Sequence, residues 1–139
     1  MHLAIDGYAR TEHKLGDLER IRRFLDNYPR LLEMTKICQP VVMHYEATDT
    51  LNSGVSGFVM IAESHISIHT YPLKDFIHID IFSCNPFDDC RVITDVKEYF
   101  QLVRVKTWVI ERGLEHIESK MTLPISQSPE EKIYGISEG

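Results

Sequence analysis

Residues able to move protons or act as nucleophiles gather in two neighbouring segments of the sequence. The first segment, ESHISIHTY, runs from Glu63 to Tyr71, and the second, FIHIDIFSC, runs from Phe76 to Cys84. Imidazole, hydroxyl, carboxyl and thiol groups are the side chains that enzymes use for acid–base and nucleophilic chemistry. We therefore take these two segments as the candidate reactive region.

Both segments alternate between polar and apolar residues, which is typical of β-strands that have one face in the core. Residues 72–75 would form the hairpin turn between them, and a four-residue turn fixes which residues face each other. The expected opposed residues are His69 with His78, Ser67 with Asp80, and Glu63 with Cys84. Isoleucines then fill one face of the hairpin, and the other face collects polar side chains: His65, His69, His78, Asp80 and Cys84.

A zinc site and a cysteine nucleophile are the alternatives for this polar face. His65 and His69 have the HxxxH spacing of a helical zinc site, but four residues on a strand span about 13 Å, too far for a shared metal. We therefore expect no metal. A neighbouring imidazole could activate Cys84 as a nucleophile, although the sequence reveals no oxyanion hole for it. The cluster could also be the solvent-exposed face of a half-buried strand.

The rest of the chain must supply the elements that position this hairpin. Apolar residues at three- and four-residue spacing predict a helix over 15–34, kinked at Pro29, and a helix over 95–103, capped by Thr94. The other expected features are strands or apolar runs at 2–9, 41–48, 58–71, 76–84 and 105–112, a turn at 49–57, a loop at 85–91, and a surface tail at 122–139. Because hairpin connections dominate, we expect a single α+β domain over residues 1–139. Its architecture would be a two-layer sandwich, an antiparallel β-sheet with helices packed on one face.

Composition and charge exclude several classes of function. The chain has 139 residues and a formal net charge of −6. Nucleic-acid binding depends on contacts of Lys and Arg with phosphate, so we expect no nucleic-acid partner. No stretch approaches the roughly 18 apolar residues of a membrane span, and no signal peptide is readable, so we expect no membrane partner. Three cysteines without a CxxC pair predict reduced thiols in a cytoplasmic protein.

The candidate region resembles the core of the small prokaryotic S-adenosylmethionine decarboxylases, a family of pyruvoyl-dependent proenzymes. The family pattern is GVSG, then ESH, then IHT with an aromatic residue and proline, then a strand that ends in a cysteine. These motifs occur here in that order, within SGVSGFVMIAESHISIHTYP and FIHIDIFSC. The close match covers about residues 53–84, and the combination is far more specific than any single motif.

The resemblance implies that the chain cleaves its own backbone between Glu63 and Ser64. The Ser64 hydroxyl would attack the preceding carbonyl to form an ester, and elimination would leave a pyruvoyl group on residue 64. The products would be a β chain of residues 1–63 and an α chain of residues 64–139. A pyruvoyl carbonyl forms a Schiff base with a substrate amine and draws electrons from the leaving carboxylate.

The same resemblance assigns further roles. Ser56 and His69 would assist the cleavage, with His69 as the proton acceptor. Cys84 would be the acid that protonates the product carbon. The product, decarboxylated S-adenosylmethionine, would serve as the aminopropyl donor of spermidine and polyamine biosynthesis. The cleaved protomers would form a homodimer.

Two positions depart from the family pattern and bear on the substrate. The family places an aromatic residue a few positions before GVSG to stack on adenine, and here that segment begins with Thr50. The acidic residue that would hold the ribose hydroxyls is replaced by Leu73. Two alternatives therefore stay open: a related pyruvoyl-dependent decarboxylase of L-arginine or L-ornithine, and a non-catalytic homologue that binds a partner enzyme. We expect structural roles for Cys38, Cys90, His78 and Asp80.

Overall fold

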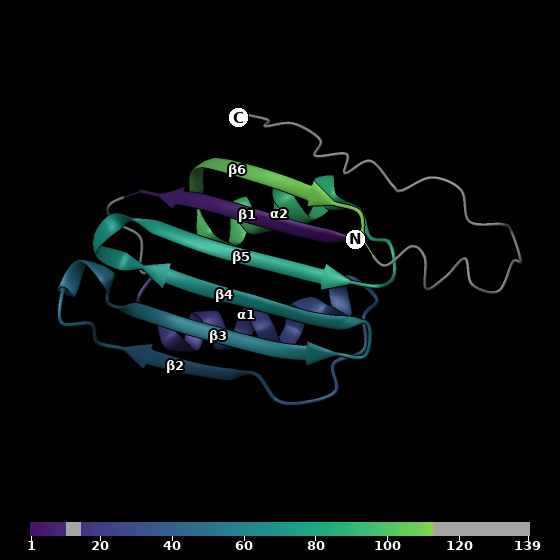
Figure 1. The fold of residues 1–139 in the computed structure, drawn as a ribbon, viewed down its shortest axis with the longest axis horizontal. Coiled ribbons are helices and arrows are strands. Elements are labelled where there is room, and N and C mark those ends of the chain that lie inside the picture. Colours follow the sequence, from purple (N-terminus) through teal and green to yellow (C-terminus); the bar gives the residue numbers. More distant parts are fainter. Residues whose placement is uncertain (11–14, 113–139) are drawn as a thin grey trace, which may run out of the picture.

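A computed structural model describes residues 1–10 and 15–112 of the chain. These residues form one six-stranded sheet with two α-helices on one of its faces (Figure 1). The strands are β1 (His2–Ala9), β2 (Val41–Tyr45), β3 (Gly54–Ile61), β4 (Ser64–Tyr71), β5 (Phe76–Ser83) and β6 (Leu102–Ile110), and the helices are α1 (Leu18–Leu31) and α2 (Asp89–Phe100). The strand order is β2-β3-β4-β5-β1-β6, and every neighbouring pair is antiparallel. The predicted α+β sandwich with helices on one face is confirmed.

The core lies between the sheet and the two helices. Helix α1 packs against β2, β3 and β4, whereas α2 packs against β1 and β6. Every second side chain along the central strands is buried in this layer, among them Ile66, Ile68, Ile77, Ile79 and Ile81. Burial of these side chains supplies most of the driving force that holds helices and sheet together.

The opposite face of the sheet carries no helix (Figure 1), and we call it the free face. It presents the side chains that alternate with the buried ones: Val41, Met43, Tyr45, Ser56, Phe58, Met60, His65, Ser67, His69, Tyr71, Phe76, His78, Asp80 and Phe82. Several of its apolar members are well exposed, for example Met43 at 65% and Met60 at 45%. All of the histidines expected on the polar side of the hairpin therefore lie on this one surface.

Both helices begin where an aspartate caps them. Asp17 accepts a hydrogen bond from the Arg20 N–H, 3.1 Å, and α1 then runs through Pro29 to Leu31, inside the predicted range 15–34. The prediction for the second helix was wrong at its start. Helix α2 begins at Asp89 because Asp88 accepts a hydrogen bond from the Arg91 N–H, 2.9 Å, and the helix therefore covers the last three residues of the expected loop at 85–91.

The turn predicted at 49–57 was also wrong in its second half. Residues 50–52 form a short 3₁₀ turn, but residues 54–57, the GVSG motif, are the first half of β3. Its two glycines do not form a turn but allow neighbouring elements to approach β3 closely. A Cβ on Gly54 would lie 1.8 Å from the Thr70 carbonyl oxygen, and one on Gly57 would lie 2.6 Å from Leu25 Cδ1. The missing side chains let β3 lie close to β4 and to α1.

The ends of other elements differ from the prediction by a few residues. Strand β2 stops at Tyr45 and not at residue 48, and β6 begins at Leu102 and not at residue 105. A tight turn at Ala62–Glu63 divides the apolar run expected at 58–71, so that Ser64 is the first residue of β4. The tail at 122–139 lies outside the described residues. Within the described part, no helix is long and apolar enough to cross a membrane.

Candidate active site

The hairpin of β4 and β5 has the register expected from the sequence. His69 faces His78, Ser67 faces Asp80, and Ser64 faces Ser83. One residue farther along, the Cys84 N–H donates a hydrogen bond of 3.0 Å to the carbonyl oxygen of Glu63. The predicted proximity of Cys84 to the Glu63–Ser64 peptide bond is therefore confirmed.

Glu63 is held in place by hydrogen bonds from two sides. Its side-chain carboxylate accepts a hydrogen bond from the Thr35 N–H, 3.1 Å, while the Ala62 N–H donates to the Thr35 carbonyl, 2.8 Å. Its own carbonyl oxygen receives the Cys84 N–H. A backbone N–H on a carbonyl oxygen stabilises the negative charge that develops there when a nucleophile attacks the carbonyl carbon. Sequence reasoning missed this donor because a backbone N–H leaves no mark in the residue pattern.

The Ser64 hydroxyl lies beside the imidazole of the next residue, His65. The distance from Ser64 Oγ to His65 Nδ1 is 3.2 Å. The His65 ring lies between Phe58 on β3 and Phe82 on β5, with ring centroids 5.3 and 5.7 Å away. Partial burial lowers the pKa of His65, and nearby His2 lowers it further, whereas Asp80 opposes the shift. The imidazole is therefore neutral at pH 7 and able to accept a proton.

Ser56 and His69 form a second pair on the free face. Ser56 Oγ lies 2.9 Å from His69 Nδ1, across the neighbouring strands β3 and β4. His69 is five residues from Ser64 on the same extended strand, which corresponds to about 16 Å. The structure thus brings Ser64 together with Glu63 and Cys84, and Ser56 together with His69, but it keeps these two groups apart within one chain.

The remaining residues named from the sequence have local partners. Asp80 accepts a hydrogen bond from His2, 2.9 Å, and His78 pairs with Asp6, 2.7 Å. Cys38 is half-buried at the margin of the core, and all three thiols are free, Cys84 and Cys90 being exposed. Among the described residues, one group could supply three metal ligands, Asp88, Asp89 and Cys90 at the start of α2, and it includes no histidine of the hairpin.

The two positions that depart from the family pattern line one open cavity of about 500 Å³. Thr50 and Leu73 are joined there by Glu46, whose carboxylate was not singled out from the sequence. A smaller cavity of about 290 Å³, lined by Ser56 and His69 among others, lies beside it, and both cavities are lined by Gly54. The two residues that depart from the family pattern, Thr50 and Leu73, therefore lie in the cavity next to the Ser56–His69 pair.

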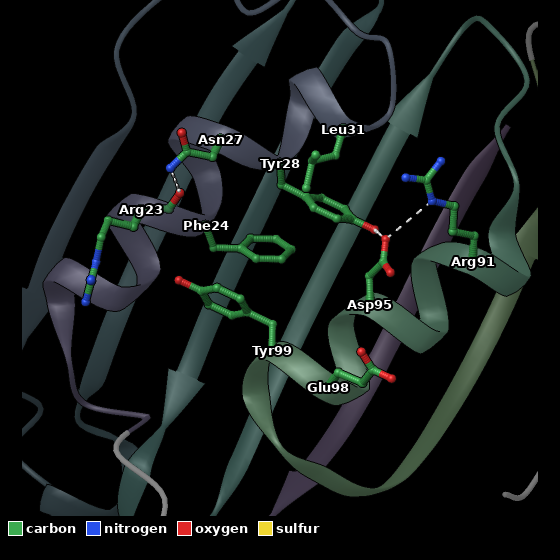
Figure 2. A pocket seen from close by; sticks show the side chains of 9 residues that line it. All are labelled: Arg23, Phe24, Asn27, Tyr28, Leu31, Arg91, Asp95, Glu98 and Tyr99. Atoms are coloured by element: carbon green, nitrogen blue, oxygen red, sulfur yellow. Dashed lines mark hydrogen bonds and ion pairs between the residues drawn. The ribbon is translucent and has the colours of Figure 1, made fainter.

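A larger cavity, about 670 Å³, lies elsewhere, between α1 and α2 (Figure 2). The Tyr28 hydroxyl donates a hydrogen bond of 3.1 Å to Asp95, which Arg91 also approaches at 3.7 Å. Burial and the adjacent Asp95 carboxylate raise the pKa of Tyr28. This cavity contains none of the reactive residues predicted from the sequence, and its aromatic and charged side chains join the two helices.

Comparison with known proteins shows which family this chain resembles. The family model described as S-adenosylmethionine decarboxylase matches residues 1–113. A relative named S-adenosylmethionine decarboxylase proenzyme from Moorella thermoacetica is 45% identical over 117 residues, which cover 81% of this chain and 86% of the relative. A protein of the same name from Aquifex aeolicus is 31% identical over 137 residues, covering 98% of this chain and 93% of the relative.

A solved structure agrees with these sequence matches. The crystal structure of the adenosylmethionine decarboxylase from Aquifex aeolicus is similar with a TM-score of 0.62 and 26% identity, and the match covers 93% of this chain and 95% of the other. The matched family model spans both the Ser64–Cys84 group and the Ser56–His69 pair. The chain belongs to the S-adenosylmethionine decarboxylase family.

Proposed function

We infer that the chain is a pyruvoyl-dependent carboxy-lyase that removes the carboxyl group of S-adenosylmethionine. Family membership and the names of the relatives support the reaction and the substrate. The single observation on this molecule that carries the inference is the surroundings of the Glu63–Ser64 peptide bond. The residue after the bond is a serine, and the Glu63 carbonyl oxygen before it accepts a hydrogen bond of 3.0 Å from the Cys84 N–H. The product would be the aminopropyl donor of polyamine biosynthesis.

The cleavage that creates the cofactor needs only groups of the chain and water. Ser64 Oγ attacks the Glu63 carbonyl carbon, the C–N bond breaks, and an ester replaces the amide. Loss of the Ser64 α-proton then expels the Glu63 carboxylate, and water converts the resulting enamine to a pyruvoyl group and ammonia. The residues present fit such a group, because Ser64 would become the N-terminus of residues 64–139, next to the exposed Cys84 thiol.

A pyruvoyl group supplies a carbonyl that withdraws electrons from an amino-acid substrate as its carboxylate leaves. The residues of this chain have the tasks of orientation and proton transfer. The Cys84 thiol would donate the proton that the product carbon requires. The cavity lined by Thr50, Leu73 and Glu46 would contact the rest of the substrate.

The separation of Ser64 from the Ser56–His69 pair favours a homodimer in which each copy completes the site of the other. Two copies would stack their free faces if a two-fold axis ran parallel to the face, across β4 near Ser67. This rotation would place the His69 of one copy over the Ser64 of the second. The exposed apolar side chains of this face, Val41, Met43, Phe58 and Met60, suit such an interface. A cytoplasmic location, expected from the free thiols, stays a prediction.

Thr50 and Leu73 favour a second candidate function, the decarboxylation of L-arginine or L-ornithine, because neither residue can stack on adenine or hold a ribose. An intact-mass measurement of the denatured wild type beside Ser64→Ala tests both candidates, with and without sodium cyanoborohydride and each substrate. We expect the wild type to be cleaved at Glu63/Ser64 into two chains, one of which carries a reduced adduct of decarboxylated S-adenosylmethionine. The Ser64→Ala variant should stay uncleaved.

Each other outcome of this measurement overturns one part of the proposal. An adduct derived from arginine or ornithine would show that this amino acid, and not S-adenosylmethionine, is the substrate. A wild-type chain that stays intact under all conditions would exclude the pyruvoyl mechanism and leave the non-catalytic homologue.

A further inference from the structure

We propose that His65 is the base that takes the proton of the Ser64 hydroxyl in the first step of self-cleavage, so that this step is completed within one chain. The inference deepens the proposed function and rests on it. It assigns a chemical role to the histidine of the ESH motif, for which the sequence and the family comparison give none.

The geometry selects His65 over His69 for this step. Nδ1 of His65 lies 3.2 Å from Ser64 Oγ, within hydrogen-bond distance. Nδ1 of His69 is engaged with the Ser56 hydroxyl at 2.9 Å, about 16 Å farther along the strand. A general base must lie within hydrogen-bond reach of the proton that it removes. Within one chain, His65 meets this requirement at Ser64 and His69 does not.

The surroundings of His65 suit a base that must stay neutral. Phe58 and Phe82 flank the ring and restrict its rotation, so that Nδ1 stays directed at the hydroxyl. The charged groups that act on the ring are His2 of β1, Asp80 of β5 and Arg112 beyond the end of β6. Partial burial is the largest influence, and together with His2 and Arg112 it lowers the pKa of the imidazole, whereas Asp80 raises it.

The proton can be followed through the whole step. Ser64 Oγ loses its hydrogen to His65 Nδ1 while it attacks the Glu63 carbonyl carbon, and the carbonyl oxygen, held by the Cys84 N–H at 3.0 Å, takes the negative charge. The imidazolium then returns the proton to the Ser64 nitrogen as the C–N bond breaks. An ester and a free amine result, and no oxidant, metal or second substrate is required.

The test uses freshly made, uncleaved chain from cell-free synthesis and follows cleavage over time by intact mass. His65→Gln removes the base, and His78→Gln is the matched control, because His78 lies on the same free face but pairs with Asp6. We expect His65→Gln to cleave at least about 100-fold more slowly and His78→Gln to stay within about twofold of wild type. Thermal unfolding of each variant checks that it has folded.

Hydroxylamine identifies the step, because it cleaves an ester quickly and an amide slowly. We expect His65→Gln to resist hydroxylamine, since the ester never forms. In His69→Ala, by contrast, the first step is intact, and hydroxylamine should release two chains. An ester in His65→Gln, or cleavage of this variant at the wild-type rate, would overturn the inference while leaving the proposed function untouched.

The pH dependence of cleavage gives a readout that a merely structural histidine would not move. The wild-type rate should rise with pH through an inflection below pH 6.5, because Nδ1 accepts a proton only in the neutral imidazole. Free imidazole should partly restore cleavage in His65→Ala. A wild-type profile without that inflection, or no rescue in a folded His65→Ala chain, would contradict the role, whereas an uncleaved wild type would contradict the proposed function itself.

Discussion

At the scale of single residues, Cys84 contributes two different groups to the same place. Its backbone N–H contacts the Glu63 carbonyl oxygen, and its side chain carries a free thiol on an exposed residue. Under the proposed function the two groups would serve two different reactions, because the Glu63–Ser64 amide exists only before cleavage and the substrate would react only after it. Cleavage and decarboxylation should therefore respond differently to a change of the side chain.

We expect Cys84→Ala to cleave normally but to decarboxylate its substrate 10²- to 10⁴-fold more slowly, roughly the contribution of a general acid. Alanine keeps the backbone N–H and removes only the thiol. The measurement is intact mass for cleavage and release of carbon dioxide for turnover. Equal losses in both would assign the thiol to the cleavage reaction as well.

Leu73 offers a second test at this scale. Leu73→Glu adds a carboxylate to the cavity that contains Thr50, where it can accept hydrogen bonds from ribose hydroxyls. A hydrogen bond to a charged group contributes about 1.5–3 kcal/mol, so the KM for S-adenosylmethionine should fall about tenfold or more. Leu51→Glu is the control, because Leu51 is exposed and lines neither cavity beside the Ser56–His69 pair. An unchanged KM in Leu73→Glu would mean that the ribose does not reach residue 73.

At the scale of elements, the residue that caps the start of α2 can be tested, because the structure has Asp88 there and the sequence suggested Thr94. Asp88→Ala removes the acceptor for the Arg91 N–H and should lower the free energy of unfolding by about 1 kcal/mol. Thr94→Ala should change it by less than about 0.5 kcal/mol, because the Thr94 hydroxyl only donates to the Cys90 carbonyl within the helix. Urea denaturation in a Ser64→Ala background, which keeps the chain intact, gives both values. A larger loss in Thr94→Ala would reverse the assignment.

The strands were predictable from the sequence, and the reason is physical. Alternation over 64–71 and 76–83 together with a turn of fixed length leaves one register that buries all the isoleucines. The helix start was not predictable in this way, because Asp88 and Thr94 are both good capping residues and only the packing of Val92 and Val96 decides between them. GVSG was mistaken for a turn because glycine allows either a tight turn or a close approach of two backbones.

The candidate site was predictable only in part. Proximity of Cys84 to Glu63 followed from the hairpin register, since both lie at its open end. The distance between Ser64 and His69 also follows from strand geometry, but a family pattern carries no record of which chain each residue acts on. The contact between Ser64 and His65 depends on side-chain conformation, which sequence spacing does not specify.

At the scale of the whole molecule, the proposed dimer can be tested by mixing two defective chains. Ser64→Ala keeps the Ser56–His69 pair and lacks the nucleophile, whereas His69→Ala keeps the nucleophile. Neither variant alone should yield free 1–63 and 64–139 chains. When the two are co-expressed, chains with His69→Ala should be cleaved by the intact His69 of a Ser64→Ala partner. Intact mass distinguishes them, and His69→Ala chains that stay uncleaved in mixed dimers would rule out action between copies.

The order of strands has a consequence for the cleaved molecule. Residues 1–63 supply β2, β3 and β1, residues 64–112 supply β4, β5 and β6, and the two sets interleave across the sheet (Figure 1). Separating the pieces would break the β3–β4, β5–β1 and β1–β6 pairings at once, so a chain cleaved between Glu63 and Ser64 would be held together without a covalent link. Cleavage would nevertheless change the molecularity of refolding: an uncleaved chain refolds at a rate independent of concentration, whereas two separated pieces would first have to meet. The working life of a cleaved protein would then be set by its unfolding barrier.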